Sequence, residues 1–198
     1  MRRPSSSSPL LGKFLLWVAL SIPNVVMELS TWILAPILGL VVNDEGRLPP
    51  WLRHFETIDN SAFGDAEHAQ RWAGRSLYGR FVAWLWRNPG YTFSNRVLGA
   101  RTSGPVHVSG NLFVSDRPLV VEGWCLRRTD EGYWHLYIVR QWAFVFCFRM
   151  NVGWKLAGSP GGPNFGQYVC TVHPFLIRSA REVNERSAHP PERSSRRQ

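Results

Sequence analysis

The chain has 198 residues, of which 44% are apolar, and its formal net charge is +9. That length fits roughly one domain, and the positive charge indicates an anionic partner, either phospholipid headgroups or nucleic acid. Three widely spaced cysteines, Cys125, Cys147 and Cys170, contain no CxxC pair, which excludes the common zinc and redox motifs.

The first predicted element is a hydrophobic membrane anchor at residues 10–42, which follows a flexible leader at residues 1–9. Its apolar run, Phe14–Val42, holds one acidic residue, Glu28, and no basic one. As one straight helix the run would be about 43 Å long, against a hydrocarbon core of about 30 Å. The pattern favours a transmembrane helix. An interfacial or hairpin-like anchor and a buried core helix are the alternatives.

Two prolines, Pro23 and Pro36, interrupt this run. Proline removes a backbone donor and clashes with the preceding helical turn. We therefore expect a break or a kink near Pro23, and the simplest division is a short segment, Leu10–Leu20, and a helix of membrane length, Asn24–Val42.

Polar residues within the run are spaced three or four positions apart. If the helix continues through Pro23, they form a polar stripe on one face: Ser21, Asn24, Glu28 and Thr31. Polar groups inside a membrane usually face the protein interior. The stripe then meets a partner helix or a water-filled space, or it packs against the protein's own soluble part.

Basic residues flank both sides of the anchor, with Arg2, Arg3 and Lys13 before it and Arg47 and Arg53 after it. The positive-inside rule leans toward a cytoplasmic N-terminus. Unpaired cysteines favour a reducing compartment for the soluble part, which points the other way. We expect the membrane to be crossed once, with the side of the soluble domain left open.

An acidic linker follows at residues 43–70. Within it Asp59, Ser61 and Asp65 have the spacing of the first half of a calcium loop. Phe63 stands where another oxygen ligand is needed, so a solvated acidic turn is the better interpretation. We predict no metal and no cofactor.

Residues 71–177 read as a small basic α+β domain. Its first part has a helical apolar period over Arg71–Arg87, with Arg71, Arg75 and Arg80 off the apolar face. This predicts one amphipathic helix, which would lie either on a membrane or on a sheet.

The remainder predicts an antiparallel β-meander of five or six strands, followed by a disordered basic tail at residues 178–198. Hairpins are expected around two turns, after which a long strand and a last strand follow. The expected segments are Val106–Val108 with Leu112–Val114, Leu119–Arg128 with Tyr133–Arg140, Ala143–Ala157, and Gln167–Ile177.

The long strand, Ala143–Ala157, alternates with a period of two. One face carries aromatic and aliphatic side chains from Phe144 to Leu156. The alternation predicts that Phe146 and Phe148 are buried and that Arg149 is exposed.

Three stretches are similar to an uncharacterised family of small proteins from tailed bacteriophages and prophages. They are the run from Glu45 to Ser61 (EGRLPPWLRHFETIDNS), the run from Trp84 to Tyr91 (WLWRNPGY), and the segment from Gly132 to Leu156. The resemblance implies a phage origin. It implies no activity, because that family has no assigned function.

No catalytic constellation is evident, so we predict that the chain is not an enzyme. The favoured function is a phage-encoded, membrane-anchored interaction or scaffold protein at the host inner membrane, where anionic lipids and a membrane or phage protein would be its partners. The alternative is a nucleic-acid-binding protein whose apolar helix packs in the fold or in an assembly. The surface expected to meet an anionic partner comprises Arg71, Arg75, Arg80, Arg127, Arg128 and Arg140.

Overall fold

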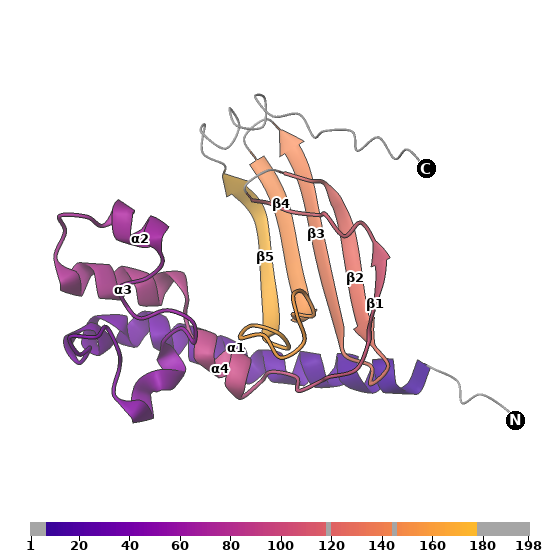
Figure 1. The fold of residues 1–198 in the computed structure, drawn as a ribbon, viewed down its shortest axis with the longest axis horizontal. Helices are drawn as coiled ribbons and strands as arrows, with labels where there is room; N and C mark the ends of the chain where they lie inside the picture. Colours follow the sequence, from indigo (N-terminus) through magenta and orange to yellow (C-terminus); the bar gives the residue numbers. More distant parts are fainter. Residues whose placement is uncertain (1–6, 118–119, 144–145, 178–198) are drawn as a thin grey trace, which may run out of the picture.

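The computed structural model describes residues 7–117, 120–143 and 146–177. The predicted tail and most of the predicted leader lie outside these residues. The predicted α+β class is confirmed: a long apolar helix and several short helices accompany an antiparallel sheet (Figure 1). The elements are α1 (Ser7–Leu40), the 3-10 helix η1 (Pro50–Phe55), α2 (Ala66–Arg71), α3 (Leu77–Arg87), α4 (Tyr91–Arg96), β1 (Val106–Gly110), β2 (Gly123–Thr129), β3 (Trp134–Ala143), β4 (Phe146–Trp154) and β5 (Tyr168–Ile177).

Helix α1 continues without a break through Pro23 and Pro36 over 34 residues, so the division expected near Pro23 is wrong. Its length is about 51 Å. The helix packs against other elements on both sides of Pro23. Tertiary packing therefore offsets the hydrogen bond that each proline removes.

The single amphipathic helix expected over Arg71–Arg87 begins only at Leu77 as α3, and Arg71 is instead the last residue of α2. Gly74 has a φ of 73°, a left-handed conformation that interrupts the helical period. Ser76 then caps α3 by accepting a hydrogen bond from the amide of Gly79. The apolar face was predicted correctly, since Phe81, Val82, Trp84 and Leu85 are buried.

Within the described residues the sheet has five antiparallel strands in the order β1-β2-β3-β4-β5. The meander and its last hairpins were predicted correctly. The first hairpin was not, because β1 pairs with β2, with Val106 opposite Thr129. The segment Leu112–Val114 belongs instead to the connection between these strands, which folds over the sheet and places Val114 against Val139.

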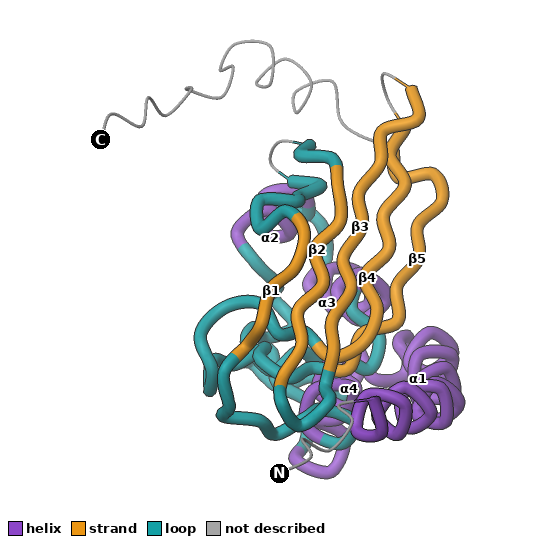
Figure 2. The backbone as a smooth tube through the Cα atoms, turned by 90° about the vertical axis from the view of Figure 1, so that its right-hand side faces the viewer, coloured by secondary structure: helices purple, strands orange, loops and turns teal. Residues whose placement is uncertain are grey.

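Helix α1 runs crosswise to the strands at one end of the sheet (Figures 1 and 2). Its N-terminal half packs on one sheet face, in a cluster with Trp134, Val152, Trp154 and Tyr168. Its C-terminal half extends past β5 and packs on α3. A separate cluster around Val139 lies on the opposite sheet face, near the end remote from α1.

The alternation along β4 was predicted correctly at one end and wrongly at the other. Val152 and Trp154 are buried under α1, but Phe146 is exposed while its neighbour Cys147 is fully buried. The β4–β5 register shifts between Cys147 and Arg149. Arg149 was predicted to be exposed, but it is half-buried. The buried face changes because α1 covers one end of the sheet and the β1–β2 connection covers the opposite face at the other end.

Candidate functional site

The outward face of α1 is apolar along its whole length. Over the described stretch 9–40, every exposed side chain is apolar, and the polar ones are buried or half-buried. Ile22 and Ile33 are 70% and 75% exposed. Contiguous apolar surface of this extent is uncommon on a soluble monomer and marks a place where something other than water is bound. The large exposed side chains are Leu11, Phe14, Leu15, Leu16, Val18, Ile22, Val25, Val26, Leu29, Trp32, Ile33, Ile37 and Leu40.

The inward face of α1 carries the predicted polar stripe. Asn24 and Thr31 are buried, and Glu28 accepts a 2.7 Å hydrogen bond from the Asn24 amide. Thr31 donates to the carbonyl of Met27, and the Ser21 hydroxyl donates to that of Val18. The stripe therefore faces the protein's own domain, which is one of the arrangements expected from the sequence.

Aromatic side chains fasten the N-terminal half of α1 to the sheet. The indole of Trp17 donates a 3.1 Å hydrogen bond to the carbonyl of Val169, and the hydroxyl of Tyr168 donates to the carbonyl of Trp17. The Trp17 ring also meets Trp134 edge-on at 5.3 Å between centroids. The Lys13 ammonium lies 4.0 Å from the centre of the Tyr133 ring. These reciprocal contacts hold the helix in one orientation on the sheet.

The C-terminal half of α1 lies close to α3. A Cβ added at Gly39 would stand 2.9 Å from a methyl group of Val82, so glycine permits this approach. Tyr78 donates to the carbonyl of Pro36, and the indole of Trp86 donates a 3.0 Å hydrogen bond to the carbonyl of Trp32. Both carbonyls belong to α1, so α3 contributes polar as well as apolar contacts to it.

Between these two attachments, a cavity of about 500 Å³ separates the inward face of α1 from the sheet. The end of α3, the start of α4 and strand β5 complete its walls. Gly90 positions α4 there, because its φ of 62° favours glycine and an added Cβ would lie 2.8 Å from Cγ of Met27. Charged and polar side chains lining the cavity include Asn24, Glu28, Arg87, Arg149, Lys155 and His173.

One wall of the cavity continues into a buried ion pair. Arg149 donates a 3.0 Å hydrogen bond to Asp116, and the hydroxyl of Tyr137 donates to the other oxygen of the same carboxylate. Burial alone would raise the pKa of Asp116, but the Tyr137 hydrogen bond and the Arg149 charge together lower it. Burial raises the pKa of Tyr137, and its bond to Asp116 raises it further. The carboxylate of Asp116 is therefore ionised at neutral pH.

His135 lies on the same sheet face and is buried. One of its ring nitrogens lies 2.7 Å from the amide oxygen of Asn151. Burial lowers the pKa of His135 to about 4, although the Asn151 hydrogen bond opposes this. The ring is thus neutral at physiological pH.

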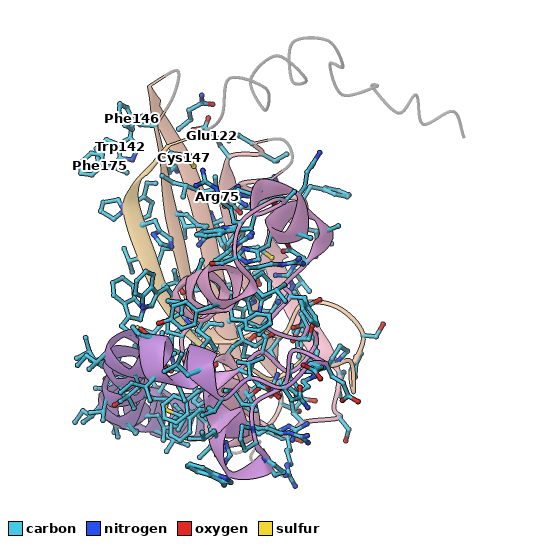
Figure 3. All side chains as sticks on the ribbon, turned by 90° about the vertical axis from the view of Figure 1, so that its left-hand side faces the viewer. Arg75, Glu122, Trp142, Phe146, Cys147 and Phe175 are labelled. Atoms are coloured by element: carbon cyan, nitrogen blue, oxygen red, sulfur yellow. The ribbon has the colours of Figure 1, made fainter. Side chains whose placement is uncertain are left out.

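The sheet face that α1 covers at one end is open at the other. Three aromatic side chains from β3, β4 and β5, Trp142, Phe146 and Phe175, gather there and project from the sheet (Figure 3). Trp142 and Phe175 are 63% and 67% exposed. Arg140 is exposed on the same face. Aromatic and cationic side chains thus share one open surface.

The arginines predicted to form a single anionic-partner surface lie in separate places. Arg71 is paired with Glu67 at 2.6 Å. Arg80 donates from two nitrogens to the carbonyl of Phe63, so its role is to join α3 to the preceding loop. The strand alternation places Arg127 on the sheet face opposite that of Arg128 and Arg140, and Arg75 is exposed near α3.

The three weak metal candidates have separate structural partners. Asp65 caps α2 by accepting from the His68 amide, and it lies 3.7 Å from Arg87. Ser61 accepts from the amide of Phe63, and Asp59 accepts from the side chain of Asn164. Within the described residues no three acidic, histidine or cysteine side chains gather to form a metal site.

The cavity and the Asp116–Arg149 pair were missed by reasoning from the sequence. The cavity joins α1 to residues more than 120 positions away, such as Lys155 and His173, and no local spacing predicts that contact. The polar stripe on α1 was the one available signal, because buried polar side chains on a long apolar helix indicate a polar space beside it.

The comparisons with known proteins give one match. Residues 9–180 match a family described as "Family of unknown function (DUF7338)". No curated protein and no solved structure matches the chain.

Proposed function

The chain belongs to this family of unknown function, and from its own geometry we propose that it is a membrane-bound interaction or scaffold protein whose helix α1 embeds its outward face in lipid. The observation that carries the proposal is the polarity of α1. Its outward face is apolar from end to end, and its polar groups face inward. That distribution is what a lipid environment selects.

The helix alone allows two arrangements in the membrane. Among the described residues α1 is long and apolar enough to cross a bilayer. The sheet, however, packs along α1, and its strands run crosswise to the helix axis (Figures 1 and 2). A perpendicular α1 would carry an open strand edge into hydrocarbon, where unpaired backbone groups cost several kcal/mol each.

We therefore favour α1 lying in the plane of one membrane interface. Its outward side chains then enter the acyl region, while the sheet stands away from the membrane into water. We further propose a phage origin, as the sequence resemblance implies, and with it the inner membrane of a bacterial host as the location. The open end of the sheet is then available to a protein partner, which suits a lysis accessory, an exclusion factor or a DNA-entry factor.

Vesicle flotation tests membrane binding. Full-length protein released from detergent should float with phosphatidylcholine and phosphatidylglycerol vesicles. Replacing Ile22 and Ile33 by Asp should reduce partitioning by at least about a hundredfold, since each buried isoleucine contributes about 1.5–3 kcal/mol.

The matched control is Leu112→Asp, which changes an exposed apolar residue in the β1–β2 connection and not in α1. It should float like the wild type. Equal flotation of the Ile22/Ile33 double variant and the wild type would refute the role given to the outward face.

A second candidate function rests on the open sheet face. Arg140, Trp142 and Phe175 combine positive charge with exposed aromatic rings, as in proteins that stack single-stranded nucleic acid on a sheet. If this is the function, single-stranded oligonucleotides should bind with a steep salt dependence. Trp142→Ala should then weaken the binding by about 1–3 kcal/mol. Vesicle binding without oligonucleotide binding would eliminate this candidate.

A further inference from the structure

The cavity behind α1 contains two side chains of opposite charge that form no salt bridge within the described residues. Glu28 lies on the α1 wall, where Asn24 donates to one of its oxygens. Lys155 lies on the wall formed where β4 ends. In the part of the chain that the structure describes, neither residue forms an ion pair, with the other or with any third residue.

The other charged residues of the cavity are already paired. Arg149 binds Asp116 at 3.0 Å, and Arg87 lies 3.7 Å from Asp65 and 3.8 Å from Glu67. These pairs use carboxylates from outside the cavity lining. What the cavity offers to a ligand is therefore one negative and one positive group on different walls.

Burial makes both free charges costly to leave without a partner. Lys155 is half-buried, and burial lowers the pKa of its ammonium, against the opposing effect of Asp59. An uncompensated charge in a partly desolvated site is retained at a cost in stability. A ligand that supplies both counter-charges at once would remove that cost.

The cavity has the size and surroundings of a ligand site at a membrane surface. Its volume of about 500 Å³ lies within the range of small-molecule sites. Trp32 and Trp86 line it and are both about half exposed. Trp32 belongs to the outward surface of α1, so the cavity adjoins the side of the helix proposed to contact lipid. Tryptophan is the side chain favoured at headgroup depth.

We propose that this cavity binds the zwitterionic phosphoethanolamine headgroup of a membrane lipid. Lys155 pairs with the phosphodiester and Glu28 with the primary amine, while Thr171 and Asn88 are available to donate further hydrogen bonds to the phosphate. The acyl chains pass Trp32 into the bilayer. The inference rests on the membrane-bound arrangement proposed above and adds a lipid class to it.

Cys170 provides a readout inside the cavity. It lines the cavity and is exposed, whereas Cys125 and Cys147 are buried. Full-length protein in a neutral maltoside detergent should be alkylated by N-ethylmaleimide at Cys170. Dihexanoyl phosphatidylethanolamine at ten times its dissociation constant should slow that reaction about tenfold by mass action.

Two comparison ligands separate the possible sources of the headgroup. Dihexanoyl phosphatidylglycerol has the phosphodiester without the amine and should protect at least about tenfold more weakly. Glycerophosphoethanolamine has the headgroup without acyl chains and should also protect more weakly. Equal protection by phosphatidylglycerol would contradict the role of the amine. Equal protection by glycerophosphoethanolamine would show that the ligand is a soluble ester and not a membrane lipid.

Variants test the two charges separately. Lys155→Met and Glu28→Gln should each weaken protection by phosphatidylethanolamine about tenfold, the equivalent of one charge-assisted hydrogen bond. Lys155→Arg should largely restore it, and Arg140→Gln, which removes an exposed cation of the open sheet face, should leave it unchanged. Protection ratios are taken within each variant, because Glu28 also raises the pKa of the Cys170 thiol.

The proposal and the membrane-bound arrangement can fail independently. The alkylation assay uses micelles, so the Ile22/Ile33 double variant should retain protection even though it no longer floats with vesicles. Absence of protection by phosphatidylethanolamine in the wild type would overturn the headgroup site and leave the flotation result standing.

Discussion

The outward face of α1 is apolar and its inward face carries the polar stripe. A surface helix of a soluble protein has the opposite arrangement. Such a helix turns its apolar stripe to the core and its polar side to water. Here Ile22 and Ile33 point away from the domain, while Asn24 and Thr31 are buried against it. The difference supports a solvent other than water on the outward side.

Two tryptophans of α1 should differ most in their contribution to stability, because one faces the sheet and the other faces outward. Trp17→Ala should lower the free energy of unfolding in detergent by about 3–4 kcal/mol, as truncations of buried aromatic residues do, because Trp17 packs on the sheet and bonds to Val169. Trp32→Ala removes the same side chain from the outward face and should cost less than about 1 kcal/mol. Denaturant titrations followed by circular dichroism give both values. Similar losses for the two variants would contradict the assignment of faces.

The buried polar groups of the sheet should make the stability of the protein depend on pH, chiefly through His135. His135 has a pKa of about 4 in the folded chain against 6.5 in the unfolded one. A base with a depressed folded pKa contributes stability that is complete above pH 6.5 and is lost as the pH falls toward 4. The loss should reach about 3 kcal/mol.

His135→Gln provides the control, because glutamine can still bond to Asn151 and does not titrate. Unfolding midpoints measured between pH 7.5 and pH 4.5 should fall more steeply for the wild type than for this variant. Parallel pH profiles would show that His135 is not the buried neutral base described here.

Alanine substitutions at two glycines of α1 should give smaller changes in stability, of opposite sign. Gly12 has no atom within 4 Å of an added Cβ, whereas at Gly39 the added carbon meets Val82 at 2.9 Å. Gly12→Ala should stabilise the protein by about 0.5–1 kcal/mol through helix propensity. Gly39→Ala gains the same propensity but crowds α3, so the net result should be a loss of about 1 kcal/mol. Stabilisation by both substitutions would mean that α1 and α3 are less closely packed than described.

Local pattern was enough to predict the α+β class, the polar stripe on α1 and most of the meander. Each of these depends on side-chain period or on a short turn such as the one after Thr129. The first hairpin failed for a non-local reason, since β1 could pair with either Leu112–Val114 or β2 and the sheet as a whole selects β2.

The continuity of α1 and the burial along β4 were also decided by tertiary packing. Helix α1 passes through Pro23 because the sheet and α3 hold its two halves in line. Phe146 is exposed because α1 does not reach that end of the strand. The cavity is a product of the same long-range packing, so its lining could not be predicted from spacing along the chain.

A depth measurement can show directly whether α1 lies along the membrane interface. Leu11, Ile22 and Ile33 are each eleven residues apart, close to three helical turns, and all three are exposed on the outward face. Each would be replaced in turn by a spin-labelled cysteine in a Cys170→Ser background, with the protein bound to bilayers. Relaxation by oxygen and by a water-soluble nickel chelate would report the depth of each label. An in-plane α1 predicts equal, shallow depths at all three positions, whereas a label at Ile22 about 16 Å deeper than those at Leu11 and Ile33 would show that α1 crosses the membrane instead.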